Sequence, residues 1–318
     1  MSTVYVLVEH TGSGLAATTA ELITAARPLG EVAAVVVGAP GVTQTLAPAL
    51  AEAGAATVVA AESADVAGRL ILPQVDALAA LAAANPGPVL IAAGASGNEI
   101  AGRLAARLAS GVLCDVVGIN ADRTAAQSVF GDQVQVSAAV GGASPIYTLR
   151  PGAVEAAPAP APAAGTVTAL ELPAVTAKDV AVTGFAPAER GSRPDLTQAK
   201  VVVAAGRGVG SKEGMELVER LADSLGAAVG VTRDAVDLEY YDGTYQIGQT
   251  GVTVSPDLYI GLGISGAIQH TSGMQTAKKI VVVNNDEDAP IFQIADLGVV
   301  GDLFDVVPAL IDEINQRK

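Results

Sequence analysis

Two glycine-rich turns in the second half of the 318-residue chain contain residue types that bind the phosphates of a dinucleotide. The first turn, at 206–210, includes Arg207, and the second, at 261–266, has the spacing Gly-x-Gly-x-x-Gly. Glycines in such turns allow backbone N–H groups to approach a pyrophosphate at the start of a helix. The same spacing also occurs in tight strand-to-helix turns that bind no ligand, so the fingerprint alone leaves both interpretations open.

Further polar residues follow the predicted strands around these turns. Thr232 and Arg233 come directly after an apolar run at 227–231, and the loop with Gln249 and Thr250 offers an amide and a hydroxyl. His270 lies about one helical turn beyond the second glycine turn, where a lone histidine could equally be a packed core residue. Because the carboxyl ends of parallel strands meet at one edge of a sheet, we expect these groups to converge on one crevice. The combination favours a bound dinucleotide over an empty turn.

The other reactive residue types exclude several kinds of site. Cys114 is the single cysteine and lies in an apolar run, so we expect a buried structural thiol and no internal disulfide. His10 and His270 are the only histidines, which excludes a multi-histidine metal site within the chain. The acidic run at 286–288 is expected to be a solvated loop, and the chain has neither a Gly-x-Ser-x-Gly elbow nor a Walker A sequence. We therefore expect neither a metal ion nor a catalytic nucleophile.

Composition and charge limit the partners and the location. The formal net charge is −15 and both halves are acidic, which disfavours nucleic acid and an anionic membrane surface as partners. Half of the residues are hydrophobic, but no apolar run approaches the roughly 18 residues that a membrane-spanning helix needs. The strand-like segment at 4–8 begins the chain without the features of a secretory signal or transit peptide, so we expect a cytoplasmic protein with no direct membrane insertion.

Apolar runs alternate with helical segments, which predicts the α/β class with two doubly wound, mainly parallel-sheet domains. Strands are predicted at 4–8, 32–37, 57–60, 89–93 and 112–117, and more exposed antiparallel strands between 127 and 149. In the second half they are predicted at 200–205, 227–231, 258–260, 279–283 and 297–300. A shift in composition at 187–194 predicts an N-terminal domain at 1–190 and a Rossmann-like C-terminal domain at 191–318. The Ala/Pro-rich segment at 156–165 is either an interdomain linker or a surface loop of the first domain.

Five stretches of the second half, at 202–208, 227–233, 246–251, 258–270 and 284–302, carry a family resemblance. They include Ser-Gly-Ala-Ile-Gln-His at 265–270 and Ala-Pro-Ile-Phe-Gln at 289–293, and in this order they resemble the α subunit of electron transfer flavoproteins. The first half is similar more loosely, through its βαβ pattern and Thr-Leu-Arg-Pro-Gly at 148–152.

The resemblance implies that the C-terminal domain binds one non-covalent FAD. At Thr232 the family often has serine, and the threonine of this chain keeps the hydroxyl group. The residues at the family's FAD-contact positions are Arg207, Thr232, Arg233, Ile247, Gly248, Gln249, Thr250, Ser265, Gly266, Ala267, Ile268, Gln269, His270, Asn284, Asp302 and Leu303.

Three of these residues are expected to tune the flavin. Arg233 near the ring and His270 near the pyrimidine carbonyl would place positive charge or hydrogen-bond donors where negative charge develops, and the Thr250 hydroxyl would bond flavin N5. Since the chain has no tryptophan, ring stacking is not expected to dominate binding.

The resemblance also implies an electron carrier rather than an enzyme. The N-terminal domain of this chain would pair with a separate β subunit, which in this family typically carries AMP. Electrons would come from dehydrogenases such as the acyl-CoA dehydrogenases of fatty acid β-oxidation and pass singly to a membrane quinone oxidoreductase or another acceptor. The alternatives are a dinucleotide-binding component of a nicotinamide-dependent dehydrogenase, which leaves Arg207, Thr250 and His270 unexplained, and a scaffold subunit with an empty pocket.

Overall fold

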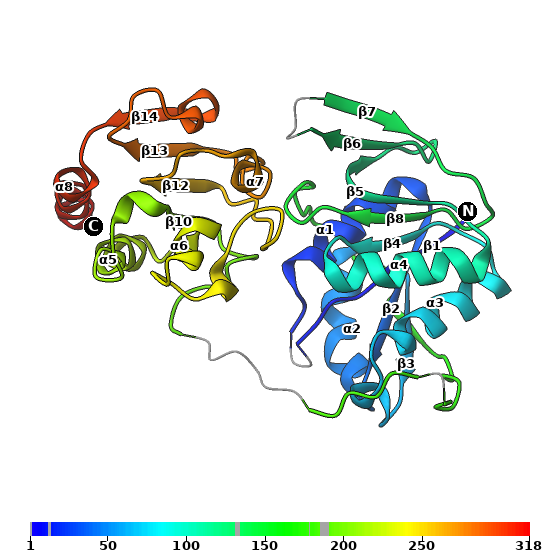
Figure 1. Ribbon diagram of the computed structural model, residues 1–318. Helices are drawn as coiled ribbons and strands as arrows, with labels where there is room; N and C mark the ends of the chain where they lie inside the picture. The colour runs from blue at the N-terminus through cyan, green and yellow to red at the C-terminus, as the bar shows by residue number, and fades with distance from the viewer. Residues whose placement is uncertain (1, 12–13, 131–133, 178, 185–190) are drawn as a thin grey trace. The chain divides into compact units, whose positions relative to one another are not determined.

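The computed structural model describes residues 2–11, 14–130, 134–177, 179–184 and 191–318, and divides into two compact units, mainly 1–187 and mainly 188–318. Each unit is an α/β fold built on its own sheet (Figure 1). The predicted fold class is therefore confirmed. The predicted boundary near residue 190 falls in 185–190, outside the described residues, and stays a prediction.

The first unit contains a sheet with the strand order β7-β6-β5-β8-β4-β1-β2-β3-β9. Neighbouring strands from β5 to β9 are parallel, and β6 runs antiparallel to β5. The strands are β1 (Thr3–Leu7), β2 (Glu31–Gly38), β3 (Thr57–Glu62), β4 (Val89–Ala92), β5 (Val112–Ile119), β6 (Ala125–Val129), β7 (Val134–Ala138), β8 (Ile146–Leu149) and β9 (Thr166–Ala169). The helices are α1 (Ala17–Ala26), α2 (Val42–Ala53), α3 (Leu72–Ala84) and α4 (Ala95–Leu108).

Alternate residues of β1 explain why helices cover both faces of this sheet. Val4 and Val6 are fully buried in one core cluster with residues of α1 and α2, whereas Tyr5 and Leu7 are buried in another with residues of α3 and α4. A central strand that is apolar on both faces needs cover on both faces, which is the arrangement of a doubly wound fold.

In the first unit, the structure corrects the prediction for Cys114 and decides between the two interpretations of the segment at 156–165. Cys114 is exposed rather than buried, because β5 lies toward one end of the sheet and Val116 is its only fully buried residue. The segment at 156–165 is a surface loop of the first unit, since the Arg27 guanidinium donates to the carbonyls of Ala157 and Pro158 and the Ala163 N–H donates to Ala51. Directly after this loop, β9 pairs in parallel with β3.

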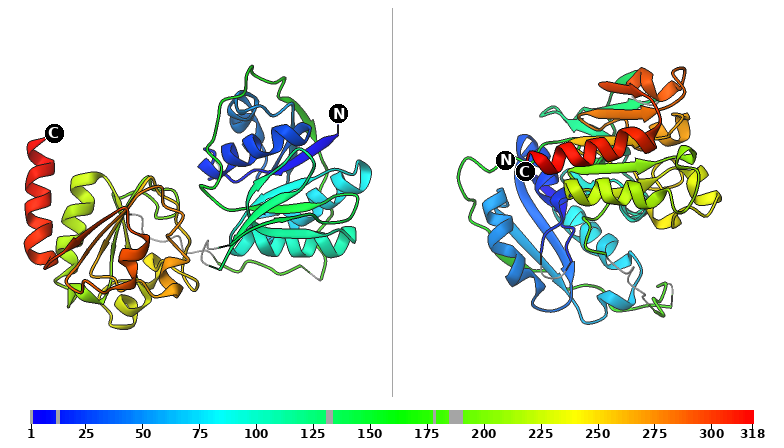
Figure 2. Two further views of the ribbon diagram at one scale, coloured as in Figure 1. Left: turned by 90° about the horizontal axis from the view of Figure 1, so that it is seen from above. Right: turned by 90° about the vertical axis from the view of Figure 1, so that its left-hand side faces the viewer.

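The second unit contains a five-stranded sheet of order β11-β10-β12-β13-β14, in which all neighbouring strands are parallel. Its strands are β10 (Val201–Ala205), β11 (Ala228–Val231), β12 (Leu258–Leu262), β13 (Ile280–Asn284) and β14 (Leu297–Val300). The helices α5 (Met215–Leu225) and α8 (Leu303–Gln316) lie side by side and pack on one face (Figure 2). The short helices α6 (Arg233–Asp237) and α7 (Ile268–Thr271) follow strands at one edge, and loop residues such as Val254 and Met274 cover the other face.

Among the described residues, none of the helices combines the length and the apolar content that crossing a bilayer requires.

A buried ion network holds the last described part of the first unit against α3. The Arg69 guanidinium is only 7% exposed and bonds Asp76 at 2.8 Å, the Pro173 carbonyl at 3.1 Å and the Asp179 carboxylate. Asp76 also pairs with Arg107. The segment that carries Asp179 is therefore fastened to the body of the unit by charge as well as by backbone bonds.

We expect Asp76→Ala to lower the free energy of unfolding of the first unit by about 3 kcal/mol, because it leaves a buried guanidinium short of a partner. Urea denaturation followed by circular dichroism measures the change. The control is Glu99→Ala, which removes the exposed pair with Arg103 and should cost less than about 1 kcal/mol. Equal losses for the two variants would show that burial does not strengthen the network.

Candidate functional site

A cavity of about 520 Å³ lies at the carboxyl edge of the second sheet. The chain turns directly from β10 into Gly206, from β11 into Thr232, from β12 into Gly263 and from β13 into Asn285, and residues of all four turns line the cavity. The connection after β10 leads to β11 on one side, and the next strand in the chain, β12, lies on the other side of β10. The cavity therefore lies at the topological switch point of the sheet, which is where open α/β sheets bind ligands.

The two glycine-rich turns meet at this switch point, backbone against backbone. The Gly208 N–H donates to the Gly263 carbonyl at 3.0 Å. A Cβ added to Gly208 would come within 2.6 Å of the Gly263 Cα, and one added to Gly263 within 2.7 Å of the Gly208 Cα. Gly263 also has a φ of +60°, a conformation that residues other than glycine rarely adopt. Glycine is required at both positions because no side chain fits between the turns.

The second glycine turn is followed by less helix than its spacing predicts. The helix after 261–266 is α7, a single turn of four residues. Gly266 has a φ of +90°, and a Cβ there would lie 2.4 Å from the Ile291 backbone nitrogen. This turn is therefore shaped by close packing against the segment at 290–294 rather than by a long helix.

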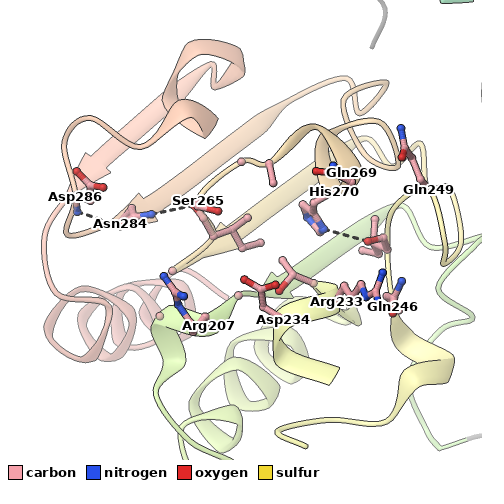
Figure 3. A pocket seen from close by; sticks show the side chains of 18 of the residues that line it. Arg207, Arg233, Asp234, Gln246, Gln249, Ser265, Gln269, His270, Asn284 and Asp286 are labelled. Atoms are coloured by element: carbon pink, nitrogen blue, oxygen red, sulfur yellow. Dashed lines mark hydrogen bonds between the residues drawn. The ribbon is translucent and has the colours of Figure 1, made fainter. Parts of the chain in front are cut away.

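Polar side chains line the cavity from two opposite sides (Figure 3). Arg207, Asp234 and Arg233 lie along one side of it, and Ser265, Gln269 and His270 along the other. Arg207 is exposed and forms no ion pair with any residue that the structure describes, whereas Arg233 is 67% exposed and reaches the Asp237 carboxylate at 3.3 Å. A cationic group without a carboxylate partner, beside backbone turns rich in glycine, fits an anionic diphosphate.

Two family models match the chain, one on each unit. The model "Electron transfer flavoprotein domain" matches residues 4–175, and "Electron transfer flavoprotein FAD-binding domain" matches residues 195–275. Over their whole lengths, the chain is 57% identical to an electron transfer flavoprotein subunit alpha of Mycobacterium leprae and 56% identical to one of Mycobacterium tuberculosis. It is 41% identical to the corresponding subunit of Paracoccus denitrificans, over 92% of this chain and 93% of that protein.

The chain belongs to the electron transfer flavoprotein α-subunit family. The resemblance stated from the sequence is thereby confirmed, together with the electron-transport and flavoprotein character of the family. The FAD-binding model covers three of the four turns that line the cavity.

Most residues that the family resemblance singled out are brought together here. The cavity is lined by Arg207, Thr232, Arg233, Ile247, Gln249, Thr250, Ser265, Gly266, Ala267, Gln269, His270 and Asn284. Gly248 and Ile268 lie between lining residues without lining the cavity themselves. Asp302 instead caps α8, with its Oδ1 accepting from the Phe304 N–H at 2.8 Å, and Leu303 is buried in the core beside α5. For all of these residues, lining or not, contact with a flavin stays a prediction.

The structure adds lining residues that the family positions did not include. They are Gly206, Gly208, Asp234, Gln246, Gly263, Ile264, Asn285 and Asp286. Asp286 was expected to belong to a solvated acidic run, and it lies two residues after the end of β13, so its position near the strand end could have indicated the cavity. Gln246 lies on the long loop between α6 and β12 and begins the stretch 246–251 that carries the family resemblance, but it was not among the family's contact positions.

That loop extends the edge of the sheet beside β11. The Ile247 N–H donates to the Val231 carbonyl at 2.9 Å, and the Gln249 N–H donates to the Gln269 carbonyl at 2.8 Å. Within the loop, the Gln246 amide donates to the Thr250 hydroxyl oxygen at 2.8 Å. A hydroxyl that accepts one hydrogen bond still has its own hydrogen to donate, so Gln246 leaves Thr250 able to act as a donor in the cavity.

Thr232 combines a structural and a site position. Its side-chain oxygen accepts from the Ala235 N–H at 3.4 Å and caps the start of α6, which places Arg233 as the first residue of that helix. Thr232 is only 8% exposed, yet it lines the cavity. A serine or threonine is suited to this position because it caps the helix and keeps a hydrogen to donate.

We expect Gly208→Ala to destabilise the second unit by roughly 1–3 kcal/mol, since the new methyl group must separate two backbone segments. Urea unfolding of the full chain measures the loss. The matched control is Gly243→Ala in the same unit, where a Cβ would meet only the Val236 side chain at an ordinary 3.4 Å. If both variants were equally stable, the contact between the turns would not constrain the site.

Proposed function

We propose that the chain is the α subunit of an electron transfer flavoprotein heterodimer that binds one non-covalent FAD in the cavity at the edge of its second sheet. The observation that carries the proposal is the convergence of the glycine turns, Arg207, Arg233 and Thr250 on one cavity within the segment matched by the FAD-binding model. The relatives are named as alpha subunits, and the matching β subunit would pair with the first unit and carry AMP.

Each part of the cavity suits a different part of the flavin dinucleotide. The Arg207 guanidinium and the backbone N–H groups of the glycine turns would hold the diphosphate. The Arg233 guanidinium would stabilise negative charge on the ring, and the Thr250 hydroxyl would donate to N5. When bound, FAD supplies the electron-accepting and electron-donating chemistry, and the protein supplies orientation and electrostatics.

The proposed role is that of a carrier rather than a catalyst of substrate chemistry. Electrons would arrive from dehydrogenases such as the acyl-CoA dehydrogenases and leave one at a time for a membrane quinone oxidoreductase or another acceptor. Among the lining residues, no serine, cysteine or histidine is arranged as a nucleophile with a base within the described part of the chain. The polar groups present bind and polarise, which is what a flavin electron carrier requires.

Flavin binding is tested by producing the chain together with its β subunit and recording the visible spectrum. The expected result is a yellow heterodimer with a flavin absorption band near about 450 nm. A colourless heterodimer that takes up no added FAD would overturn the proposal. If that complex instead bound a nicotinamide dinucleotide, the dehydrogenase-component alternative would be supported.

We expect Arg233→Ala to lower the reduction potential of the bound flavin. Removing a solvent-exposed positive charge near the ring is worth about 1 kcal/mol, which corresponds to about 40 mV for one electron. Redox titration measures the shift. Arg220→Ala is the control, because it removes the same charge from an exposed position on α5 that does not line the cavity. Equal potentials in the two variants would rule out a specific role for Arg233.

A further inference from the structure

A buried pair of polar side chains, Tyr259 and His270, supports the wall of the cavity. Tyr259 belongs to β12 and is 0% exposed, and His270 belongs to α7 and is 5% exposed. The Tyr259 hydroxyl lies 2.7 Å from the His270 Nε2, and the His270 Nδ1 lies 3.1 Å from the Ile247 carbonyl oxygen. His270 lines the cavity, whereas Tyr259 lies behind it in the apolar core.

The hydrogen-bond partners of His270 are compatible with only one tautomer of the neutral ring. A backbone carbonyl can only accept, so the hydrogen of the neutral imidazole must be on Nδ1. Nε2 then carries a lone pair, and the Tyr259 hydroxyl donates to it. A cationic ring would carry hydrogens on both nitrogens and would force the hydroxyl hydrogen toward the surrounding apolar side chains.

Burial favours the same assignment. It lowers the pKa of His270 to about 4, although the bond to the Ile247 carbonyl acts in the opposite direction. It raises the pKa of Tyr259 far above its ordinary value, so the phenol keeps its hydrogen. The charged residues that line the same cavity are Arg207, Arg233, Asp234 and Asp286, and none of these forms an ion pair with the ring among the described residues.

We propose that Tyr259 is a positioning residue of the flavin site, whose hydroxyl holds His270 as the neutral Nδ1–H tautomer against the Ile247 carbonyl. The role of this pair in tuning a flavin rests on the function proposed above. Both ring nitrogens are used by protein partners, so the imidazole is held in one orientation at the wall of the cavity. Positive potential in the cavity then comes from Arg233, Arg207 and backbone N–H groups.

The tautomer is measured directly by long-range proton–nitrogen NMR of the full-length, ¹⁵N-labelled chain. The chain has only two histidines, so His10→Gln assigns the remaining ring signals to His270. The expected spectrum shows a protonated Nδ1 and an unprotonated Nε2, unchanged from about pH 8 to about pH 5. A protonated Nε2, or a ring that becomes cationic above about pH 6, would overturn the proposal.

Tyr259→Phe tests whether the hydroxyl sets the tautomer. Loss of one hydrogen bond to Nε2 should reduce the preference for the Nδ1–H form roughly fivefold, which a purely structural role of the phenol would not do. Tyr147→Phe is the matched control, since Tyr147 is also 0% exposed and its hydroxyl donates to the Arg123 carbonyl in the first unit. An unchanged tautomer ratio in Tyr259→Phe would contradict the assignment.

The outcomes separate this inference from the proposed function. The tautomer is measured on the chain without any flavin, so failure to bind FAD would overturn the proposed function and leave the tautomer result standing. A chain that binds FAD but carries Nε2–H would overturn the inference alone. If Tyr259→Phe does not fold, the wild-type spectrum still decides, because it reports the tautomer without any change in the core.

Discussion

The contact between Gly208 and Gly263 is the constraint on which the site depends. β10 and β12 are parallel neighbours, and their carboxyl ends emerge side by side at the switch point of the sheet. The two turns that follow pack backbone to backbone, so the N–H and carbonyl groups of both remain close to the cavity instead of being screened by side chains. A ligand phosphate can approach a surface of this kind closely, which a turn with side chains would prevent. The positions of Arg207 and Ser265 follow from these turns, since each residue is within three positions of the contact.

Few charged groups set the electrostatic potential in the cavity, and the two positive ones stand out because the chain as a whole is strongly acidic. Arg207 and Arg233 are the basic residues among those lining the cavity, and they are exposed, so salt and water weaken their fields. The buried His270 sits in a low-dielectric environment where a charge would act strongly, yet burial keeps it neutral. The site therefore combines exposed permanent charges with a buried neutral ring, and the local potential follows the arginines and the backbone dipoles.

The sequence was sufficient for the fold and for most of the candidate site, for a physical reason. Runs of Val, Ile and Ala such as 201–205 are buried on both faces of a parallel sheet, and a strand of this kind is visible in the sequence as a continuous apolar segment. Residues directly after such strands could be placed at the carboxyl edge without further information. Cys114 was predicted wrongly because an apolar run does not reveal that its strand lies toward the end of a sheet. The hydrogen bonds of Gln246 and Tyr259 could not be predicted, since they depend on how a long loop and a one-turn helix pack.

The few tyrosines of the second unit lie outside the lining of the cavity and support it indirectly. Apart from the His270 imidazole, no aromatic ring is among the residues that line the cavity in the described part of the chain. Tyr241 and Tyr245 instead pack edge to face at 5.0 Å within the loop before β12, and the Tyr241 hydroxyl donates to Glu219 of α5 at 2.8 Å. This fastens the loop that carries Gln246 and Thr250 to the helical face of the unit. The aromatic residues therefore act on the site indirectly, by holding polar groups in place, and a planar ligand must be bound through hydrogen bonds and shape rather than by ring stacking within this chain.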